Sequence, residues 1–226
     1  MKRISFLFIA VALLVTASVS VSTASTDGKL DQILDQMQKS AASITTIYAN
    51  MEQLKRDPNI GGNAEKYKGQ VFFKHFGKGN DKVKIVYSAP RGQTVWIVGD
   101  EITLYQANIG QAIVTSRKAA ASRGDEFSAV ATPYTSVPEL KRQYNIVYAG
   151  DDNGMAKLEL TPKGKSSLKR MTLWVDQSHW LPAKSHIVEA SGNASTFIFT
   201  DLKKNSVISN GTFEVKLPKE TKIIRK

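Results

Sequence analysis

The sequence of 226 residues contains no cysteine. This absence excludes disulfide-stapled domains, thiolate zinc sites, cysteine nucleophiles and the acylated cysteine that anchors bacterial lipoproteins. Histidine is also scarce, and none of His75, His179 and His186 stands at metal-ligand spacing from another His, Asp or Glu. A G-x-S-x-G elbow, a phosphate-binding loop and a dinucleotide fingerprint are missing too. We therefore expect no metal site, no cofactor, no catalytic residues and no enzymatic activity.

Acidic residues are fewer than basic ones, 20 against 31, so the formal net charge is +11. With 42% hydrophobic residues the chain is too apolar for a disordered tail, and its length suits one domain. A basic surplus can indicate nucleic acid, an anionic membrane surface or only solubility. Because the lysines are spread along the chain and no nucleic-acid-binding motif is present, we expect no nucleic-acid partner. Anionic headgroups or acidic proteins are the simpler explanation.

Long apolar runs are missing except at the start of the chain. Two basic residues precede an apolar run over residues 4–15, and small residues follow. This pattern is typical of a secretory signal peptide over residues 1–24, with cleavage after Ala24. The alternative is a membrane anchor, which needs about 20 apolar residues, but the apolar character is lost at Thr16. We expect an exported single domain over residues 25–226 with a net charge of +9.

Hydrophobic periodicity predicts one long helix and many strands. Apolar residues recur every three or four positions over 28–44, which indicates an amphipathic helix. From residue 45 the period changes to two, and residues 68–116 read as short strands separated by turns. Residues 117–133 break this pattern and suggest a helix or a lid-like loop. Residues 136–143 suggest a short helix with Ser136 as its cap.

The last ninety residues predict a second run of strands with turns every 8 to 12 residues. Asp151 and Asp152 fall in one of these turns, where we expect solvated side chains. Strands this numerous favour a mostly β (α+β) fold, built on a large antiparallel sheet or barrel with the N-terminal helix over an apolar face. The strands expected here are 144–149, 155–161, 169–175, 182–189, 195–202 and 212–217.

The order of several short segments resembles the LolA-type outer-membrane lipoprotein carriers of the Gram-negative periplasm. The expected N-terminal helix, followed by Ile47-x-Ala49-x-Met51-x-Gln53, matches the opening of that family. No single motif is specific, but the collinear set covers nearly the whole mature chain. The remaining matching segments are 71–75, 87–90, 99–105, 144–146, 158–163, 168–171, 192–202 and 213–218.

This resemblance implies an incomplete antiparallel β-barrel closed by the N-terminal helix and short lid helices, with a hydrophobic cavity. It implies a monomeric periplasmic carrier that binds the acyl chains of lipoproteins. The implied partners are the acylated cargo, an inner-membrane ABC-type lipoprotein release complex and an outer-membrane receptor. Carriage or sensing of another lipid or glycolipid is the first alternative, and an envelope hydrolase on the same scaffold is the second.

Large apolar residues on one face of the front strands are the candidate cavity lining, with two residues of the lid closing it. A filled core explains any one of them better than a ligand role does, and only the topology favours a cavity. The candidates are Ile47, Met51, Val71, Phe73, Val83, Ile85, Tyr87, Val95 and Ile97 from the sheet, and Phe127 and Val130 from the lid.

His75 occupies the position where the family has an arginine that holds the lid by hydrogen bonds to backbone carbonyls. Histidine has at most two donors where arginine has five, and a histidine latch would respond to pH. The alternative is that His75 only ends a strand. A Gly/Asn-rich stretch over residues 76–81 and Ile85, where a large aromatic is frequent, also depart from the family pattern.

Overall fold

The computed structural model describes residues 24–61, 63–77, 80–123 and 136–226. The expected signal peptide, apart from Ala24, and the lid residues Phe127 and Val130 lie outside these residues. The helices are α1 (Ala24–Ala42), α2 (Arg117–Arg123) and α4 (Val137–Gln143), with 3₁₀ turns η1 (Ala107–Ile109) and η3 (Asn210–Phe213). The strands are β1 (Thr46–Arg56), β2 (Glu65–His75), β3 (Asp81–Ala89), β4 (Gln93–Val98), β5 (Glu101–Gln106), β6 (Gln111–Ser116), β7 (Tyr144–Asp152), β8 (Met155–Pro162), β9 (Leu168–Asp176), β10 (Leu181–Glu189), β11 (Ala194–Lys204) and β12 (Lys222–Arg225).

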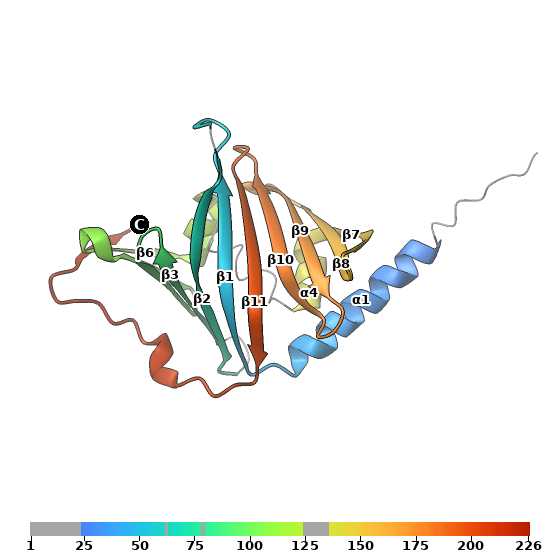
Figure 1. Ribbon diagram of the computed structural model, residues 1–226, viewed down its shortest axis with the longest axis horizontal. Coiled ribbons are helices and arrows are strands. Elements are labelled where there is room, and N and C mark those ends of the chain that lie inside the picture. Colours follow the sequence, from blue (N-terminus) through green and yellow to red (C-terminus); the bar gives the residue numbers. More distant parts are fainter. Residues whose placement is uncertain (1–23, 62, 78–79, 124–135) are drawn as a thin grey trace, which may run out of the picture.

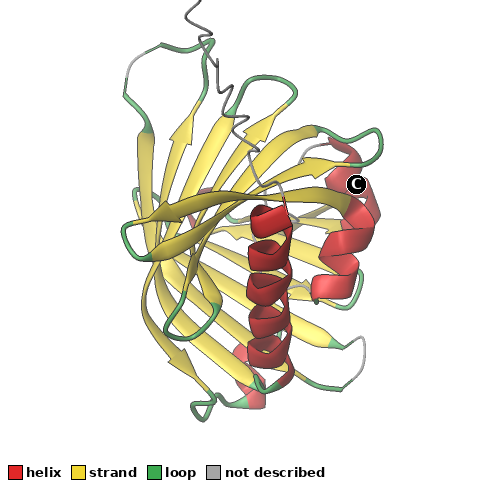
Figure 2. Ribbon diagram, turned by 90° about the vertical axis from the view of Figure 1, so that its right-hand side faces the viewer, coloured by secondary structure: helices red, strands yellow, loops and turns green. Residues whose placement is uncertain are grey.

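The strands form one open 12-stranded sheet in the order β12-β6-β5-β4-β3-β2-β1-β11-β10-β9-β8-β7. Every pair is antiparallel except β12 and β6, and β1 joins the two halves of the sheet by pairing with both β2 and β11. The sheet is strongly curved, and α1 lies on its concave side (Figures 1 and 2). The expected mostly β fold with an incomplete barrel is confirmed.

The core lies between α1 and the concave face of the sheet. Val83, Ile85 and Tyr87 alternate along β3 with Lys82 and Lys84, and only the apolar members are buried. The same period-two pattern on the other strands produces one continuous apolar cluster, to which α1 contributes Ile33, Leu34 and Met37. Burial at the helical and strand periods explains why the sequence pattern predicted both kinds of element.

Tight turns connect the strands where the backbone must enter the left-handed region. Asn153 and Gly154 join β7 to β8 with φ of 51° and 77°, as a two-residue hairpin turn requires. The acidic pair before this turn is bonded: Asp152 accepts a hydrogen bond from the Trp174 indole at 2.7 Å, and Asp151 accepts one from Gln177 at 3.1 Å. The two carboxylates therefore connect the end of β7 to β9 and to the β9–β10 turn.

The strand expected over 212–217 is wrong. Residues 210–213 form η3 instead, because Phe213 is buried on the outer side of the sheet and packs edge to face on Phe76 at 5.9 Å. The segment is held there locally, since the Thr212 N–H donates to the Ser209 carbonyl, and Lys74 Nζ donates to the Ile208 carbonyl at 2.8 Å. The chain then continues to β12 beside β6 (Figure 1).

Two helix details also differ from expectation. The N-terminal helix runs from Ala24 to Ala42 rather than from 28 to 44. Ser136 stands at the cap position of α4, but its hydroxyl makes no capping hydrogen bond. The Val137 N–H donates to Gln38 Oε1 of α1 at 3.1 Å instead, so the start of α4 is satisfied by tertiary packing.

Candidate functional site

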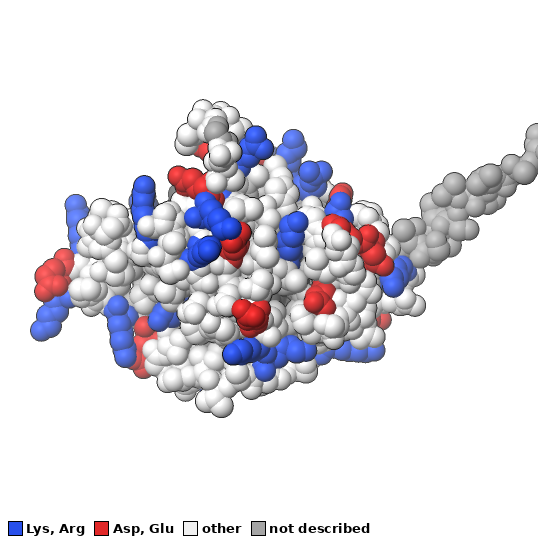
Figure 3. All heavy atoms as spheres, viewed as in Figure 1, with Lys and Arg blue, Asp and Glu red and all other residues white. Residues whose placement is uncertain are grey.

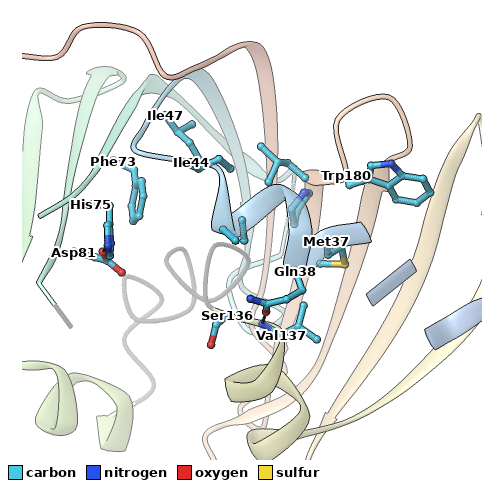
Figure 4. A pocket seen from close by; sticks show the side chains of 14 residues that line it. Met37, Gln38, Ile44, Ile47, Phe73, His75, Asp81, Ser136, Val137 and Trp180 are labelled. Carbon is cyan, nitrogen blue, oxygen red and sulfur yellow. Dashed lines mark hydrogen bonds and ion pairs between the residues drawn. The ribbon is translucent and has the colours of Figure 1, made fainter. Parts of the chain in front are cut away.

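An apolar pocket of about 200 Å³ lies where the C-terminal end of α1 meets β1, β2 and the β9–β10 turn (Figure 4). It is assembled from segments that are distant in sequence. The residues that line it are Met37, Gln38, Ala41, Ala42, Ile44, Ile47, Phe73, His75, Asp81, Ser136, Val137, Trp180, Leu181 and Pro182.

The apolar wall of this pocket is a small cluster beside the main core. Ile44, Ile47 and Leu181 are buried and contact one another, and Phe73 and Leu202 pack against them while partly exposed. These side chains come from the α1–β1 junction, β1, β10, β2 and β11. The pocket is therefore continuous with the inner face of the sheet.

Trp180 is placed at the pocket by an unusual turn. Its φ is 56°, a left-handed conformation that a bulky side chain rarely adopts. Hydrogen bonds hold the turn: the Trp180 N–H donates to the Asp176 carbonyl at 2.7 Å, and both the N–H and the hydroxyl of Ser178 donate to Asp176 Oδ1. Ser40 of α1 also donates to the His179 carbonyl at 2.6 Å. Together these bonds fix the turn against the end of α1, and the Trp180 ring points away from Phe73 and His75 and packs against the main core (Figure 4).

The polar rim lies at the hairpin end of β2 and β3. His75 Nδ1 lies 2.5 Å from Asp81 Oδ1, and both side chains are partly exposed. The His75 N–H donates to the Thr45 carbonyl at 2.8 Å, so His75 does end a strand. Its expected lid partners fall outside the described residues. Asp81 and Asp100 also act on Arg117, whose pKa is lowered by burial and partly restored by these two carboxylates.

The structure divides the expected cavity residues of the sheet, together with the latch candidate His75, into two groups. Ile47, Phe73 and His75 line the pocket. The other sheet residues lie on the same inner face, but they are packed in the main core with α1 and are no more than 6% exposed. This second group is Met51, Val71, Val83, Ile85, Tyr87, Val95 and Ile97.

The inner face also carries buried polar groups. The Tyr87 hydroxyl donates to Gln53 Oε1 at 3.0 Å, and Gln53 Nε2 lies 3.4 Å from Ser195 Oγ. Ser185 is fully buried on the neighbouring strand, and its hydroxyl has no hydrogen-bond partner within the described part of the chain. The interior is therefore mostly apolar, with a few polar groups between the apolar side chains.

Sequence reasoning missed several pocket residues. The helical periodicity places Met37 and Ala41 on the apolar face of the predicted N-terminal helix, and Trp180 falls between two expected strands. A signal for Trp180 existed, because a large aromatic in a short polar turn between two strands has no place in a solvated loop. Gln38, Ser136 and Val137 had no sequence signal, because only the tertiary contact between α1 and α4 brings them to the rim.

Metal-ligating side chains do not cluster among the described residues. No group of three or more His, Asp or Glu among them could hold a metal ion. No helix in this part of the chain is long and apolar enough to span a membrane. The arrangement of an apolar wall, one aromatic and a polar rim is typical of a site that binds an apolar chain by burial.

Comparison with known proteins shows the family of the chain. Residues 42–216 match the family described as outer membrane lipoprotein carrier protein LolA. A similar protein is the outer-membrane lipoprotein carrier protein of Albidiferax ferrireducens, 23% identical over 195 residues that cover 85% of this chain and 90% of that one.

Two solved structures support the fold alone. An uncharacterized conserved protein from Thermus thermophilus superposes with a TM-score of 0.55 at 14% identity, covering 88% of this chain and 99% of that one. A putative outer membrane lipoprotein-sorting protein domain from Vibrio parahaemolyticus gives 0.51 at 16% identity, covering 81% and 96%. From the match over residues 42–216, the chain belongs to the LolA family of outer membrane lipoprotein carrier proteins.

Proposed function

We propose that the protein is a periplasmic carrier that shields the acyl chains of lipoproteins and moves them from the inner to the outer membrane. The supporting observation is a pocket whose apolar wall continues into the inner face of a curved sheet under a single long helix. Residues 1–24 act as the signal peptide, and residues 25–226 form the carrier domain.

The energetics require an enclosed site. Burial of an acyl chain is worth about 0.8 kcal/mol per CH₂, so one sixteen-carbon chain represents on the order of 12 kcal/mol. A flat surface patch recovers only part of this free energy. A carrier therefore needs a site that surrounds the chain.

The pocket must enlarge to accept such a chain. Its volume of about 200 Å³ is below the range of roughly 300–1,000 Å³ typical of sites for drug-sized ligands. The adjacent space is filled by the inner-face residues and by Ile33, Leu34 and Met37 of α1. We infer that cargo enters beside Phe73 and Trp180 and displaces α1 from part of the sheet, so that acyl contacts replace helix contacts.

Few polar contacts oppose this displacement. Gln38 accepts one hydrogen bond from Val137, Ser40 donates one to His179, and Lys141 forms an exposed ion pair with Asp31 at 3.3 Å. An exposed ion pair contributes little to stability. A helix held mainly by non-directional apolar packing can exchange those contacts for cargo at low net cost, which suits a carrier that must also release.

His75 stays a candidate for the lid latch. It lies at the rim, and Asp81 already occupies its Nδ1, so Nε2 is the nitrogen available to a lid carbonyl. The expected partners are acylated lipoprotein cargo, an inner-membrane ABC-type release complex and an outer-membrane receptor, with the carrier acting as a monomer and without enzymatic activity.

A glutamate in the pocket wall tests the proposal. Phe73→Glu places a charge where the acyl chain passes, and the partly exposed position lets the variant fold. We expect it to lose its soluble complex with a triacylated lipoprotein, measured by co-purification from the periplasm and mass spectrometry. Ile85→Glu is less informative, because a carboxylate at a fully buried position destabilises the fold itself.

Val147→Glu is the matched control, because Val147 is 59% exposed on the outer side of β7. It should carry cargo like the wild type. If Phe73→Glu folds and still holds acylated lipoprotein, the pocket is not the acyl site. If wild type carries only a free lipid, the protein is a carrier of another amphiphile.

A further inference from the structure

The convex side of the sheet carries basic residues in rows across neighbouring strands. Cross-strand register places the members of one row side by side on β8, β9, β10, β11, β1 and β2, all pointing away from the core. That row is Lys157, Trp174, Lys184, Ile198, Glu52 and Lys68. The next row on this face contains Glu159, Thr172, His186, Thr196, Leu54 and Lys66. The row after it contains Arg170, Val188, Ala194 and Arg56.

The acidic members of these rows are already neutralised. Glu52 forms an ion pair with Lys66 at 2.7 Å, and Glu159 lies 3.7 Å from Lys157. Four cations then remain without a carboxylate partner among the described residues: Arg56, Lys68, Arg170 and Lys184. We call these four the basic patch. Figure 3, which has the viewpoint of Figure 1, shows Lys and Arg side chains spread over this face with acidic ones between them.

The patch is broad. From Lys184 to Lys68 it crosses three strand spacings, about 14 Å at roughly 4.8 Å each. Lys184 lies over the Trp174 ring, with Nζ 4.1 Å from its centroid, and a concavity of about 530 Å³ adjoins Lys68, Gln70 and Thr200. A small anion would neutralise one or two of these charges. A surface that bears many anions neutralises all four.

We propose that the basic patch binds the anionic headgroups of a phospholipid bilayer. Charge complementarity favours a bilayer because it presents a dense array of phosphates to a wide face. The pocket residues project from the opposite, inner face of the sheet. The carrier thus rests on a membrane through its convex face, independently of whether cargo fills its pocket.

Vesicle binding by the cargo-free mature chain, residues 25–226, tests this proposal. The wild type should co-sediment at low salt with phosphatidylcholine vesicles that contain phosphatidylglycerol, and not with pure phosphatidylcholine vesicles. The triple variant R56E/K68E/R170E should bind on the order of a hundredfold more weakly, since each basic residue near an anionic surface contributes about fivefold. Raising the salt should abolish wild-type binding.

The control variant is K219E/K222E/K226E. It makes the same change in net charge at exposed positions near β12, at the far edge of the sheet. It should bind vesicles like the wild type. An equal loss of vesicle binding in both triple variants would mean that net charge alone determines binding. If the wild type binds polyglutamate but not vesicles, the basic patch binds an acidic protein instead. Either result overturns the proposal, and neither bears on the acyl site.

Discussion

Trp180 shows how a single residue couples backbone strain to the site. A non-glycine residue in the left-handed region costs about 1–2 kcal/mol, and here the bonds to Asp176 and the packing of the ring offset that cost. Trp180→Ala removes the ring and keeps the strain, whereas Trp180→Gly removes both. We therefore expect the glycine variant to exceed the alanine variant in free energy of unfolding by about 1 kcal/mol, measured by urea denaturation.

Both Trp180 variants should bind acylated cargo more weakly, because each loosens the packing of the β9–β10 turn, which lines one side of the pocket. The unfolding comparison is diagnostic, since glycine is ordinarily the less stable choice. An alanine variant as stable as the glycine variant would show that the turn is unstrained. Unchanged cargo binding in both would remove Trp180 from the site.

At the scale of single residues, sequence alone identified part of the pocket. Ile47, Phe73 and His75 were predicted because strand alternation and the family resemblance both place them on one inner face. The same alternation could not separate pocket from core, since Ile85 and Val95 share that face but lie where α1 covers it. Which inner-face residues stay accessible depends on where the helix lies, and local periodicity does not encode that position.

At the scale of elements, long periodic segments were predictable and short ones were not. α1 and the strands β7 to β11 lie within a few residues of their expected ranges, because each repeats its pattern over at least six residues. β12 has only four residues and two adjacent isoleucines, so it shows no alternation. The expected strand over 212–217 failed because Phe213 packs against Phe76 on the outer face instead of joining a ladder.

Two partly buried histidines should make the free energy of unfolding depend on pH. His179 lies in the β9–β10 turn against α1, and His186 lies on the convex face of β10. Burial lowers the pKa of both below the ordinary value of 6.5. At His179 the Asp176 carboxylate opposes this effect and Lys204 adds to it, and at His186 both Arg170 and Lys184 add to it. The folded state therefore binds a proton at these positions less readily than the unfolded state does.

The free energy of unfolding should consequently be highest above pH 6.5 and fall as the pH drops below it. At more acidic pH, protonation of Asp176 should lower the free energy of unfolding further, because hydrogen bonds from Ser178 lower the pKa of its carboxyl in the folded state. Urea denaturation on either side of pH 6.5 measures the effect. The double variant H179Q/H186Q should flatten the profile in the histidine range, and a wild-type profile that is flat there would contradict this prediction.

At the scale of the whole molecule, we propose different roles for the two faces of one sheet. The concave face and α1 enclose the apolar interior, and the convex face carries the four cations of the basic patch. Part of the surplus of basic residues seen in the composition thus lies on a surface opposite the pocket. Substitutions on one face should therefore change cargo binding, and substitutions on the other should change membrane binding, each without affecting the other property.

The central claim is that acyl chains bind on the inner side of this sheet, beside Phe73. Phe72 and Phe73 are adjacent on β2 but project to opposite faces: Phe72 packs on Tyr48 outside, and Phe73 lines the pocket. A benzophenone amino acid at each position, irradiated in the presence of a triacylated lipoprotein, tests the claim directly. We predict that position 73 crosslinks to the acyl chain and position 72 does not. Crosslinking at position 72 alone, or equally at both positions, would contradict the account.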